Sequence, residues 1–120
     1  MAPSRPLKRT CNTVMNRETQ RVAAIDRLIH EPSRMLIMSI LYAGEQVGFL
    51  YLLNETGLTK GNLSNHISRL EQGNYIQVEK SFRGKVPQTL LSITPQGRSA
   101  FETYRKQLKL LADSLPSSDS

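Results

Sequence analysis

The stretch GLTKGNLSNHISRL (residues 57–70) decides the fold of this chain. Leu63, Ile67 and Leu70 recur at the spacing of one face of an α-helix. Thr59 precedes them and can cap the helix, because its hydroxyl can accept a hydrogen bond from a backbone N–H of the first turn. The stretch therefore predicts a helix that starts after Thr59, with a buried inner face and a polar outer face.

The outer face of this helix is unusual. A helical wheel with about 100° per residue directs small or hydrogen-bonding residues outward: Gly61, Asn65, Ser68 and Gln72 at the centre, Asn62 and Arg69 on one shoulder, Lys60 and Ser64 on the other. No carboxylate occurs between Lys60 and Leu70. Asn, Arg and Ser bond base edges or phosphates in the DNA major groove, and a glycine in the first turn lets the helix N-terminus approach a phosphate. The pattern predicts a DNA-recognition helix; the alternative is a surface helix that happens to lack acidic residues.

Two helices are predicted before this stretch. The first begins at Thr19 and is broken by the sequence HEPSR, and its apolar stripe consists of Val22, Ile25 and Ile29. The second begins at Pro32, which suits the first helical position, and ends at Gly44. Because this second helix is apolar on most sides, we expect it to be buried at the centre of the domain.

Short elements surround the predicted recognition helix. One or two extended residues near Val47 lead into a short helix over residues 49–56, and Gly73 is expected to end the recognition helix. Residues 75–82 then alternate in the manner of a strand, and residues 88–94 form a second strand after a charged turn, RGKVP. The two strands predict a β-hairpin.

A last helix is predicted after the hairpin, with Thr94 as its cap and Pro95 in its first turn. Its apolar residues are spaced 3, 4, 3 and 4 apart, which forms a seam of the coiled-coil type: Phe101, Tyr104, Leu108, Leu111 and Leu115. A long exposed apolar seam is unfavourable in so small a chain. We therefore expect the terminal helices to build a homodimer; the alternative is that the seam packs on its own core.

The order of elements predicts a fold that is mainly α with a small β-hairpin. Helices followed by a two-stranded hairpin form the winged helix-turn-helix, here with added N- and C-terminal dimerisation helices. We expect a flexible basic arm at residues 1–18, the winged-helix domain at 19–115 and a disordered tail at 116–120. A solubilising tail is the alternative for the arm.

Charge, cysteine content and hydropathy limit the class of protein. The chain of 120 residues carries a net charge of +6, of which residues 1–21 contribute +4, with five basic residues and one acidic residue. The basic residues Lys80, Arg83 and Lys85 surround the hairpin tip, where a wing would touch the sugar-phosphate backbone or a minor groove. Cys11 is the single cysteine, which is most simply a free thiol in a reducing compartment such as the cytoplasm. No apolar run is long enough to span a membrane.

Two segments, LTKGNLSNHISRLEQGNYI and TPQGRSAF, carry a family resemblance. The chain resembles the winged-helix transcriptional regulators of the MarR/ArsR superfamily over roughly residues 22–112. The resemblance implies a homodimer that binds a pseudo-palindromic operator in double-stranded DNA, with the recognition helix in the major groove and the wing on the flank. The residues expected to contact DNA are Thr59, Lys60, Gly61, Asn62, Ser64, Asn65, Ser68, Arg69, Lys80, Arg83, Gly84 and Lys85.

No metal or cofactor is expected. Metal-sensing relatives carry a cysteine pair in the helix before the recognition helix, whereas this chain has FLYLLNETG there. His30 and His66 have no metal-ligand spacing, so we interpret His30 as a helix-boundary residue and His66 as a partly buried flank of the recognition helix. The sequence gives no sign of an effector pocket, and no catalytic constellation that would predict an enzyme. The competing functions are a protein-interaction module without specific DNA binding and an RNA-binding module, although no aromatic stacking platform is visible.

Overall fold

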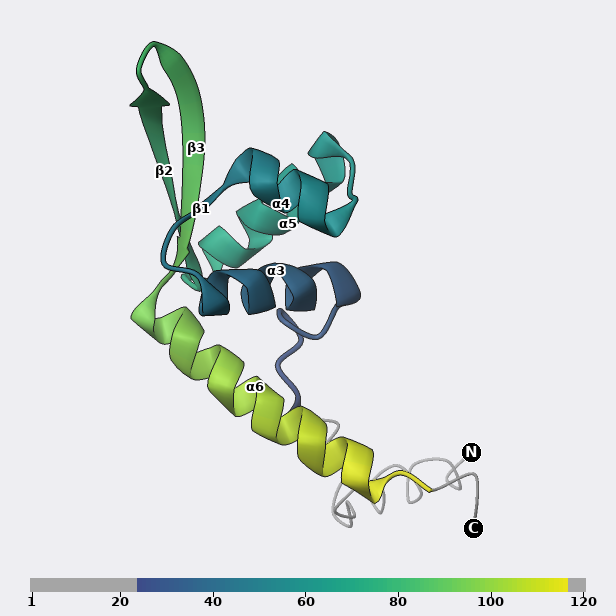
Figure 1. The fold of residues 1–120 in the computed structure, drawn as a ribbon. Coiled ribbons are helices and arrows are strands. Elements are labelled where there is room, and N and C mark those ends of the chain that lie inside the picture. Colours follow the sequence, from purple (N-terminus) through teal and green to yellow (C-terminus); the bar gives the residue numbers. More distant parts are fainter. Residues whose placement is uncertain (1–23, 117–120) are drawn as a thin grey trace, which may run out of the picture. The chain divides into compact units, whose positions relative to one another are not determined.

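Residues 24–116, which are the residues described by the computed structural model, form four helices and three strands (Figure 1). In chain order these are α3 (Pro32–Ala43), β1 (Val47–Gly48), α4 (Phe49–Thr56), α5 (Lys60–Gln72), β2 (Ile76–Arg83), β3 (Val86–Ile93) and α6 (Pro95–Ser114). This order confirms the predicted winged helix-turn-helix. The predicted arm and Cys11 lie outside the described residues, and the predicted division into arm, domain and tail stays a prediction.

The chain divides into two compact units. One unit spans Asp26–Arg105 and holds all the winged-helix elements together with the first part of α6. In the described part of the chain, the other unit consists of residues 24–25 and 106–116. The candidate DNA-binding residues all belong to the first unit.

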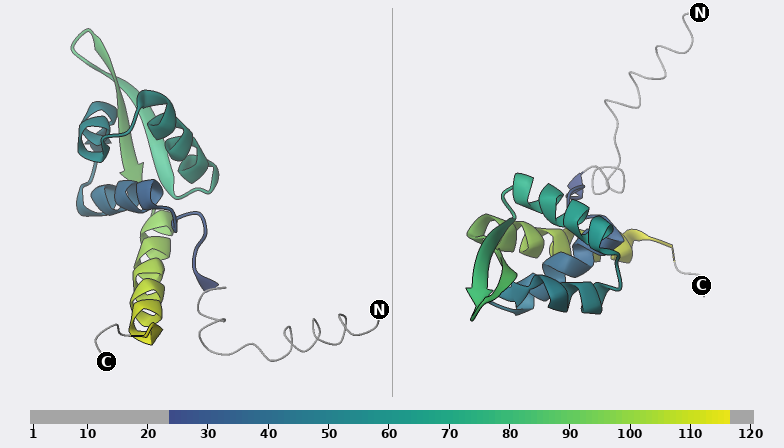
Figure 2. Two further views of the ribbon diagram at one scale, coloured as in Figure 1. Left: turned by 90° about the vertical axis from the view of Figure 1, so that its right-hand side faces the viewer. Right: turned by 90° about the horizontal axis from the view of Figure 1, so that it is seen from above.

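The core of the unit Asp26–Arg105 lies between its helices and its sheet. Figures 1 and 2 show α3, α4 and α5 grouped beside the hairpin, whose tip extends beyond them. Helix α3 packs against α4, α5 and β3, whereas α5 packs against β2. The side chains that are fully or almost fully buried are Ile29, Ile37, Met38, Leu41, Val47, Leu52, Leu63, Ile67, Leu70, Ile76, Leu91, Phe101 and Tyr104. Each aliphatic side chain of this kind contributes about 1.5–3 kcal/mol through its removal from water.

The sheet contains one more paired strand than the predicted hairpin. Its order is β1-β3-β2 and all pairs are antiparallel, with Val47 opposite Leu91. The predicted turn RGKVP is wrong in length, because Arg83 already pairs with Val86 and the loop consists of two residues. Gly84, at the first loop position, has φ 67°, which is the backbone geometry of a type II′ hairpin turn and favours glycine.

Helix α6 begins as predicted and packs on α3 through its first turns. The Thr94 hydroxyl accepts a hydrogen bond from the Gly97 N–H at 2.9 Å, so Thr94 caps the helix. Gly97 is buried, and a Cβ built on it would lie 2.0 Å from the carbonyl oxygen of Tyr75, so no other residue fits. Further along, the Tyr42 hydroxyl donates to Glu102 at 2.6 Å, and the Tyr42 and Phe101 rings are 5.1 Å apart.

The predicted helix from Thr19 to the HEPSR break is wrong at its end. Ala24 is the last helical residue, and a bend and turns follow through Ile29. The cause is Asp26, whose carboxylate accepts hydrogen bonds from the N–H groups of Leu28 and Ile29 at 2.9 and 3.2 Å. Such a side chain competes with the helical backbone and favours a turn.

Helix α3 is confirmed in its bounds but differs in two details. Glu31, not predicted as a cap, accepts a hydrogen bond from the Arg34 N–H at 2.8 Å. The helix is not buried on all sides, because Leu36 is 42% exposed. Gly44 ends the helix in an extended conformation, with φ −106°, instead of the usual left-handed one.

The end of α5 also differs from the prediction. The left-handed residue is Asn74, with φ 64°, whereas Gly73 has φ −82°. The N–H groups of Asn74 and Tyr75 donate to the carbonyls of Glu71 and Leu70, which is the Schellman arrangement. A Cβ on Gly73 would lie 2.4 Å from a terminal methyl group of Leu28, so a larger residue there would require this flexible side chain to move.

Candidate nucleic-acid interface

The inner face of α5 fixes the helix on the domain. Leu63, Ile67 and Leu70 are buried, as the spacing predicts. The Thr59 hydroxyl accepts a hydrogen bond from the Asn62 N–H at 3.2 Å, and this confirms Thr59 as the cap. The connection from α4 is only three residues long and begins at Gly57, which is left-handed with φ 70°. This short link gives the helix-turn-helix its fixed geometry.

The outer face of α5 is entirely exposed. Every predicted contact residue on it lies at the surface: Thr59, Lys60, Gly61, Asn62, Ser64, Asn65, Ser68 and Arg69. Within residues 24–116, the side chains of Asn62, Asn65, Ser68 and Arg69 make no hydrogen bond or ion pair. Their donors and acceptors are therefore directed to solvent or to an external partner.

Gly61 lies in the first turn of α5 with no local reason to be glycine. Its φ is not in the left-handed region, and a Cβ built on it would have no atom within 4 Å. The residue is therefore required neither by backbone conformation nor by packing in this chain. Its effect is to lower the surface at the start of the helix, where backbone N–H groups favour an anion.

The hairpin tip carries the second group of predicted contact residues. Lys80, Arg83, Gly84 and Lys85 are all exposed, with Gly84 and Lys85 forming the two-residue loop. From Lys80 to Thr89 the chain has three basic residues and no acidic one. The hairpin and α5 are in direct contact, because β2 packs against α5.

The basic side chains of this region are electrostatically unpaired. Among residues 24–116, the single approach of a basic side chain to a carboxylate within 4 Å is that of His66 Nδ1 to Glu31 at 3.9 Å, and this histidine is charged only when it is protonated. Lys60, Arg69, Lys80, Arg83 and Lys85 thus have no carboxylate partner in the described part of the chain. An unpaired basic surface attracts a polyanion without first losing internal contacts.

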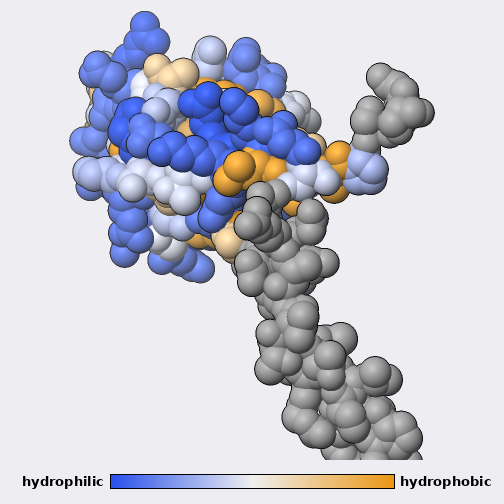
Figure 3. Space-filling view, turned by 90° about the horizontal axis from the view of Figure 1, so that it is seen from below, coloured by the Kyte–Doolittle hydropathy of each residue, from blue (hydrophilic) through white to orange (hydrophobic). Residues whose placement is uncertain are grey.

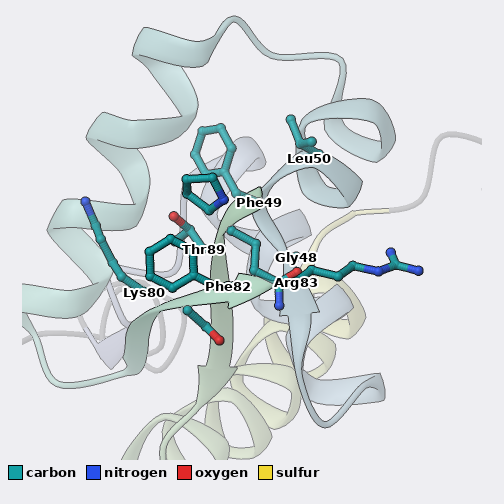
Figure 4. A pocket seen from close by; sticks show the side chains of 10 residues that line it. Gly48, Phe49, Leu50, Lys80, Phe82, Arg83 and Thr89 are labelled. Carbon is teal, nitrogen blue, oxygen red and sulfur yellow. The ribbon is translucent and has the colours of Figure 1, made fainter. Parts of the chain in front are cut away.

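An open cleft separates the wing from the start of α4. It has a volume of about 620 Å³ and is lined by Gly48, Phe49, Leu50, Lys80, Ser81, Phe82, Arg83, Pro87, Gln88 and Thr89. Figure 4 shows Phe49 of α4 and Phe82 of β2 beside the same space, with Lys80 and Arg83 extending from the strand in different directions. Phe82 was not among the residues predicted to contact DNA, although it is the last residue of the strand predicted at residues 75–82.

Arg34 of α3 and His66 of α5 form a hydrogen-bonded pair. Arg34 donates from Nη1 to Nδ1 of His66 at 3.1 Å and from Nε to the carbonyl of Leu28 at 2.6 Å. These bonds connect α5 to the start of α3. His66 is a partly buried flank of α5, as predicted, with 17% of its side chain exposed. No pattern in the sequence marks the pairing of Arg34 with His66, because the two residues are far apart in the chain.

His30 lies just before α3, at the predicted helix boundary, and contacts Tyr104. A hydrogen bond of 2.8 Å joins His30 Nδ1 to the Tyr104 hydroxyl, which is also 3.3 Å from the sulfur of Met35. Burial, followed by the charge of Asp26, raises the pKa of Tyr104. In the described ranges there is no cluster of three or more His, Cys, Asp or Glu side chains that could hold a metal ion.

The residues predicted to form a dimer interface fall into two groups. Ile25 and Ile29 of the N-terminal stripe and Phe101 and Tyr104 of the seam are buried in the single chain, as the alternative of packing on the chain's own core expects for the seam. Leu108 and Leu111 are half-buried, Leu115 is 61% exposed, and Val22 lies outside the described residues. Figure 3 shows one face of the molecule, on which hydrophobic side chains reach the surface between hydrophilic ones. Among the predicted interface residues that the structure describes, those with apolar surface left for a second chain therefore lie on the later turns of α6.

This arrangement, a helix-turn-helix followed by a basic hairpin, defines a winged-helix protein. A family model for the winged helix DNA-binding domain matches residues 33–112, and the chain belongs to this family. The chain is similar to an uncharacterized protein of Methanocaldococcus jannaschii, with 32% identity over 90 residues, which span 74% of this chain and 97% of that protein. None of the helices described is long and apolar enough to cross a membrane.

Solved structures agree with this family. A transcriptional regulator homologue from Pyrococcus horikoshii has a TM-score of 0.76 at 25% identity, over 85% of this chain and 100% of that chain. The fold is shared by an ArsR family transcriptional regulator, with a TM-score of 0.53 at 18% identity over 81% of this chain and 95% of that chain. It is also shared by a MarR-like transcription regulator from Bacillus cereus, with a TM-score of 0.58 at 17% identity over 99% of this chain and 88% of that chain. These likenesses confirm that the fold resembles that of MarR/ArsR regulators. The fold is that of DNA-binding transcription regulators rather than of enzymes.

Proposed function

We propose that this protein is a sequence-specific transcriptional regulator that binds double-stranded DNA as a homodimer in the cytoplasm. In this proposal α5 enters the major groove and the wing contacts the flanking backbone or minor groove. The observation that carries it is the outer face of α5, whose hydrogen-bonding side chains are exposed and without partners in the described part of the chain, with no carboxylate between Lys60 and Leu70.

The roles of the contact residues follow from their chemistry. Asn62 and Asn65 can form two hydrogen bonds with adenine, and Arg69 can form two with guanine. Lys60 and Ser64, on the other shoulder of α5, are placed for phosphates, and so are Lys80, Arg83 and Lys85 on the wing. The first group would supply sequence specificity and the second would supply affinity for any DNA.

Selection of bound sequences from a random DNA pool tests the proposal. A palindromic motif with two half-sites is the expected result, because a two-fold symmetric dimer places two copies of α5 in successive grooves. Asn65→Ala and Arg69→Ala should each weaken binding to that motif by about 1–3 kcal/mol and relax the preferred base at one position. Lys85→Ala is the matched control, since it should weaken binding by a similar factor for all DNA sequences. If the pool yields no enriched motif, the protein is not a sequence-specific regulator.

The homodimer part of the proposal rests on the later turns of α6. Leu108 and Leu111 are half-buried and Leu115 is exposed, so these leucines can pack against a second chain. Leu108→Glu should yield monomers in analytical ultracentrifugation, because a carboxylate buried without a partner destabilises an interface. Lys109→Glu, which adds the same carboxylate at an exposed neighbouring position, is the control and should leave the dimer intact. A Leu108→Glu protein that stays dimeric would place the interface elsewhere.

A further inference from the structure

The tip of the wing carries two large apolar side chains that the chain itself leaves uncovered. Phe82 is 69% exposed and Val86 is 65% exposed. Both lie in regular strands that flank the Gly84–Lys85 loop, with Phe82 opposite Pro87 and Val86 opposite Arg83. Single exposed apolar side chains are common on protein surfaces, but these two flank one two-residue loop at the tip of a basic hairpin.

Strand geometry places the two side chains on opposite faces of the hairpin. Successive residues of a strand point to opposite faces, and directly paired residues share a face. Phe82 therefore shares one face with Pro87. Val86 shares the other face with Arg83. The tip is thus apolar on both sides, as Figure 4 shows for the side of Phe82.

The surroundings of these side chains identify the chemistry of the partner. Residues 80–89 contain three basic residues and no acidic one, and none of the three makes an ion pair within residues 24–116. An apolar protein partner would leave these charges without counter-ions. A DNA groove offers both surfaces, because its phosphates are anionic and its walls are made of deoxyribose rings with apolar C–H groups.

We propose that Phe82 and Val86 pack against the deoxyribose walls of the groove that receives the wing, and so add non-ionic binding energy to the ionic contacts of Lys80, Arg83 and Lys85. This inference rests on the proposed function. The contact is independent of base sequence, since every nucleotide carries the same sugar. It fixes the depth to which the hairpin enters the groove.

The test measures DNA affinity and its salt dependence for the full chain on a mixed-sequence duplex of several helical turns. Phe82→Thr and Val86→Thr keep strand-forming side chains but remove the apolar surface. Each should weaken binding several-fold, and about tenfold for Phe82→Thr, with an unchanged slope of log K against log salt. Phe82→Leu should restore most of the affinity.

Two control variants separate this role from others. Lys85→Ala should lower the salt slope by about one phosphate contact. Leu36→Ala removes an exposed apolar side chain of α3 and should leave DNA affinity unchanged. Thermal unfolding of each variant verifies that the fold is intact.

The outcomes separate the two proposals. If the wild-type protein binds no duplex, the proposed function and this inference both fail. If the wild type binds and Phe82→Thr and Val86→Thr bind equally well, only the inference fails, and a protein partner becomes the occupant of the wing tip. A reduced salt slope in Phe82→Thr would also overturn it, because the substitution would then act through the basic side chains.

Discussion

Replacement of Gly61 by alanine should make the folded protein more stable and its DNA binding weaker. In the folded chain, Gly61 has an ordinary helical backbone and an added Cβ meets no atom within 4 Å. The substitution by alanine should then raise the free energy of unfolding by about 0.4–1 kcal/mol, chiefly because alanine restricts the backbone conformations of the unfolded chain. For a domain of this size that corresponds to a rise in Tm of roughly 2–8 °C.

The opposite effect is expected on binding. If the start of α5 approaches the DNA backbone closely, one added methyl group costs about 1–3 kcal/mol of overpacking, which is roughly a 5- to 150-fold loss of affinity. Fluorescence anisotropy with a labelled duplex measures this loss, and thermal unfolding measures the stability of the same sample.

A matched control separates helix stability from groove contact. Ser39→Ala changes an exposed position in the middle of α3, which is outside the proposed interface, and also raises helix propensity. It should raise Tm without altering DNA affinity. If Gly61→Ala binds DNA as tightly as the wild type, the close approach of α5 to DNA is refuted. If it lowers Tm, the structural reasoning about Gly61 is refuted.

Three further changes test the fold itself. Gly97→Ala should destabilise by about 3 kcal/mol, because the new Cβ would lie 2.0 Å from the Tyr75 carbonyl oxygen; an unchanged urea midpoint would contradict this packing. Thr94→Ala should cost about 1 kcal/mol in the same assay through loss of the α6 cap, and no loss would mean that the cap is dispensable. Burial, the hydrogen bond to Asp26 and the charge of Asp26 raise the pKa of Tyr75 from 10.0 to about 12. The unfolded chain thus releases this proton first, so the free energy of unfolding should fall between these pH values, and urea titrations should show a smaller fall for Tyr75→Phe.

The elements of the winged helix were largely predictable because their signals are local. Pro32 at the first helical position, Thr59 and Thr94 as caps, and Gly57 after α4 each act within a few residues of their own position. The errors occurred where a side chain competes with the backbone. Asp26 ends the N-terminal helix early by bonding two N–H groups, and Asn74 takes the left-handed position expected for Gly73.

The candidate site was predictable on α5 and less so on the wing. On α5, one face is apolar and the other polar, so the helical period alone separates Leu63 from Asn65. On the wing, the charged sequence RGK predicted contacts at the turn, whereas Phe82 and Val86 were not predicted as contact residues. Their exposure depends on how far the hairpin extends beyond the helices, which no local pattern contains.

The sequence by itself determined the order of the elements and the two faces of α5, because caps, turns and helical periodicity depend on neighbouring residues. Only the tertiary structure decided which apolar residues remain for other molecules. Phe101 and Tyr104 belong to the same apolar seam of 3- and 4-residue steps as Leu108 and Leu115, yet the first two are buried within the chain and Leu115 is exposed. The physical reason is that burial depends on elements distant in sequence, here α3 packing beside the first turns of α6, and a seam read from spacing alone contains no information about them.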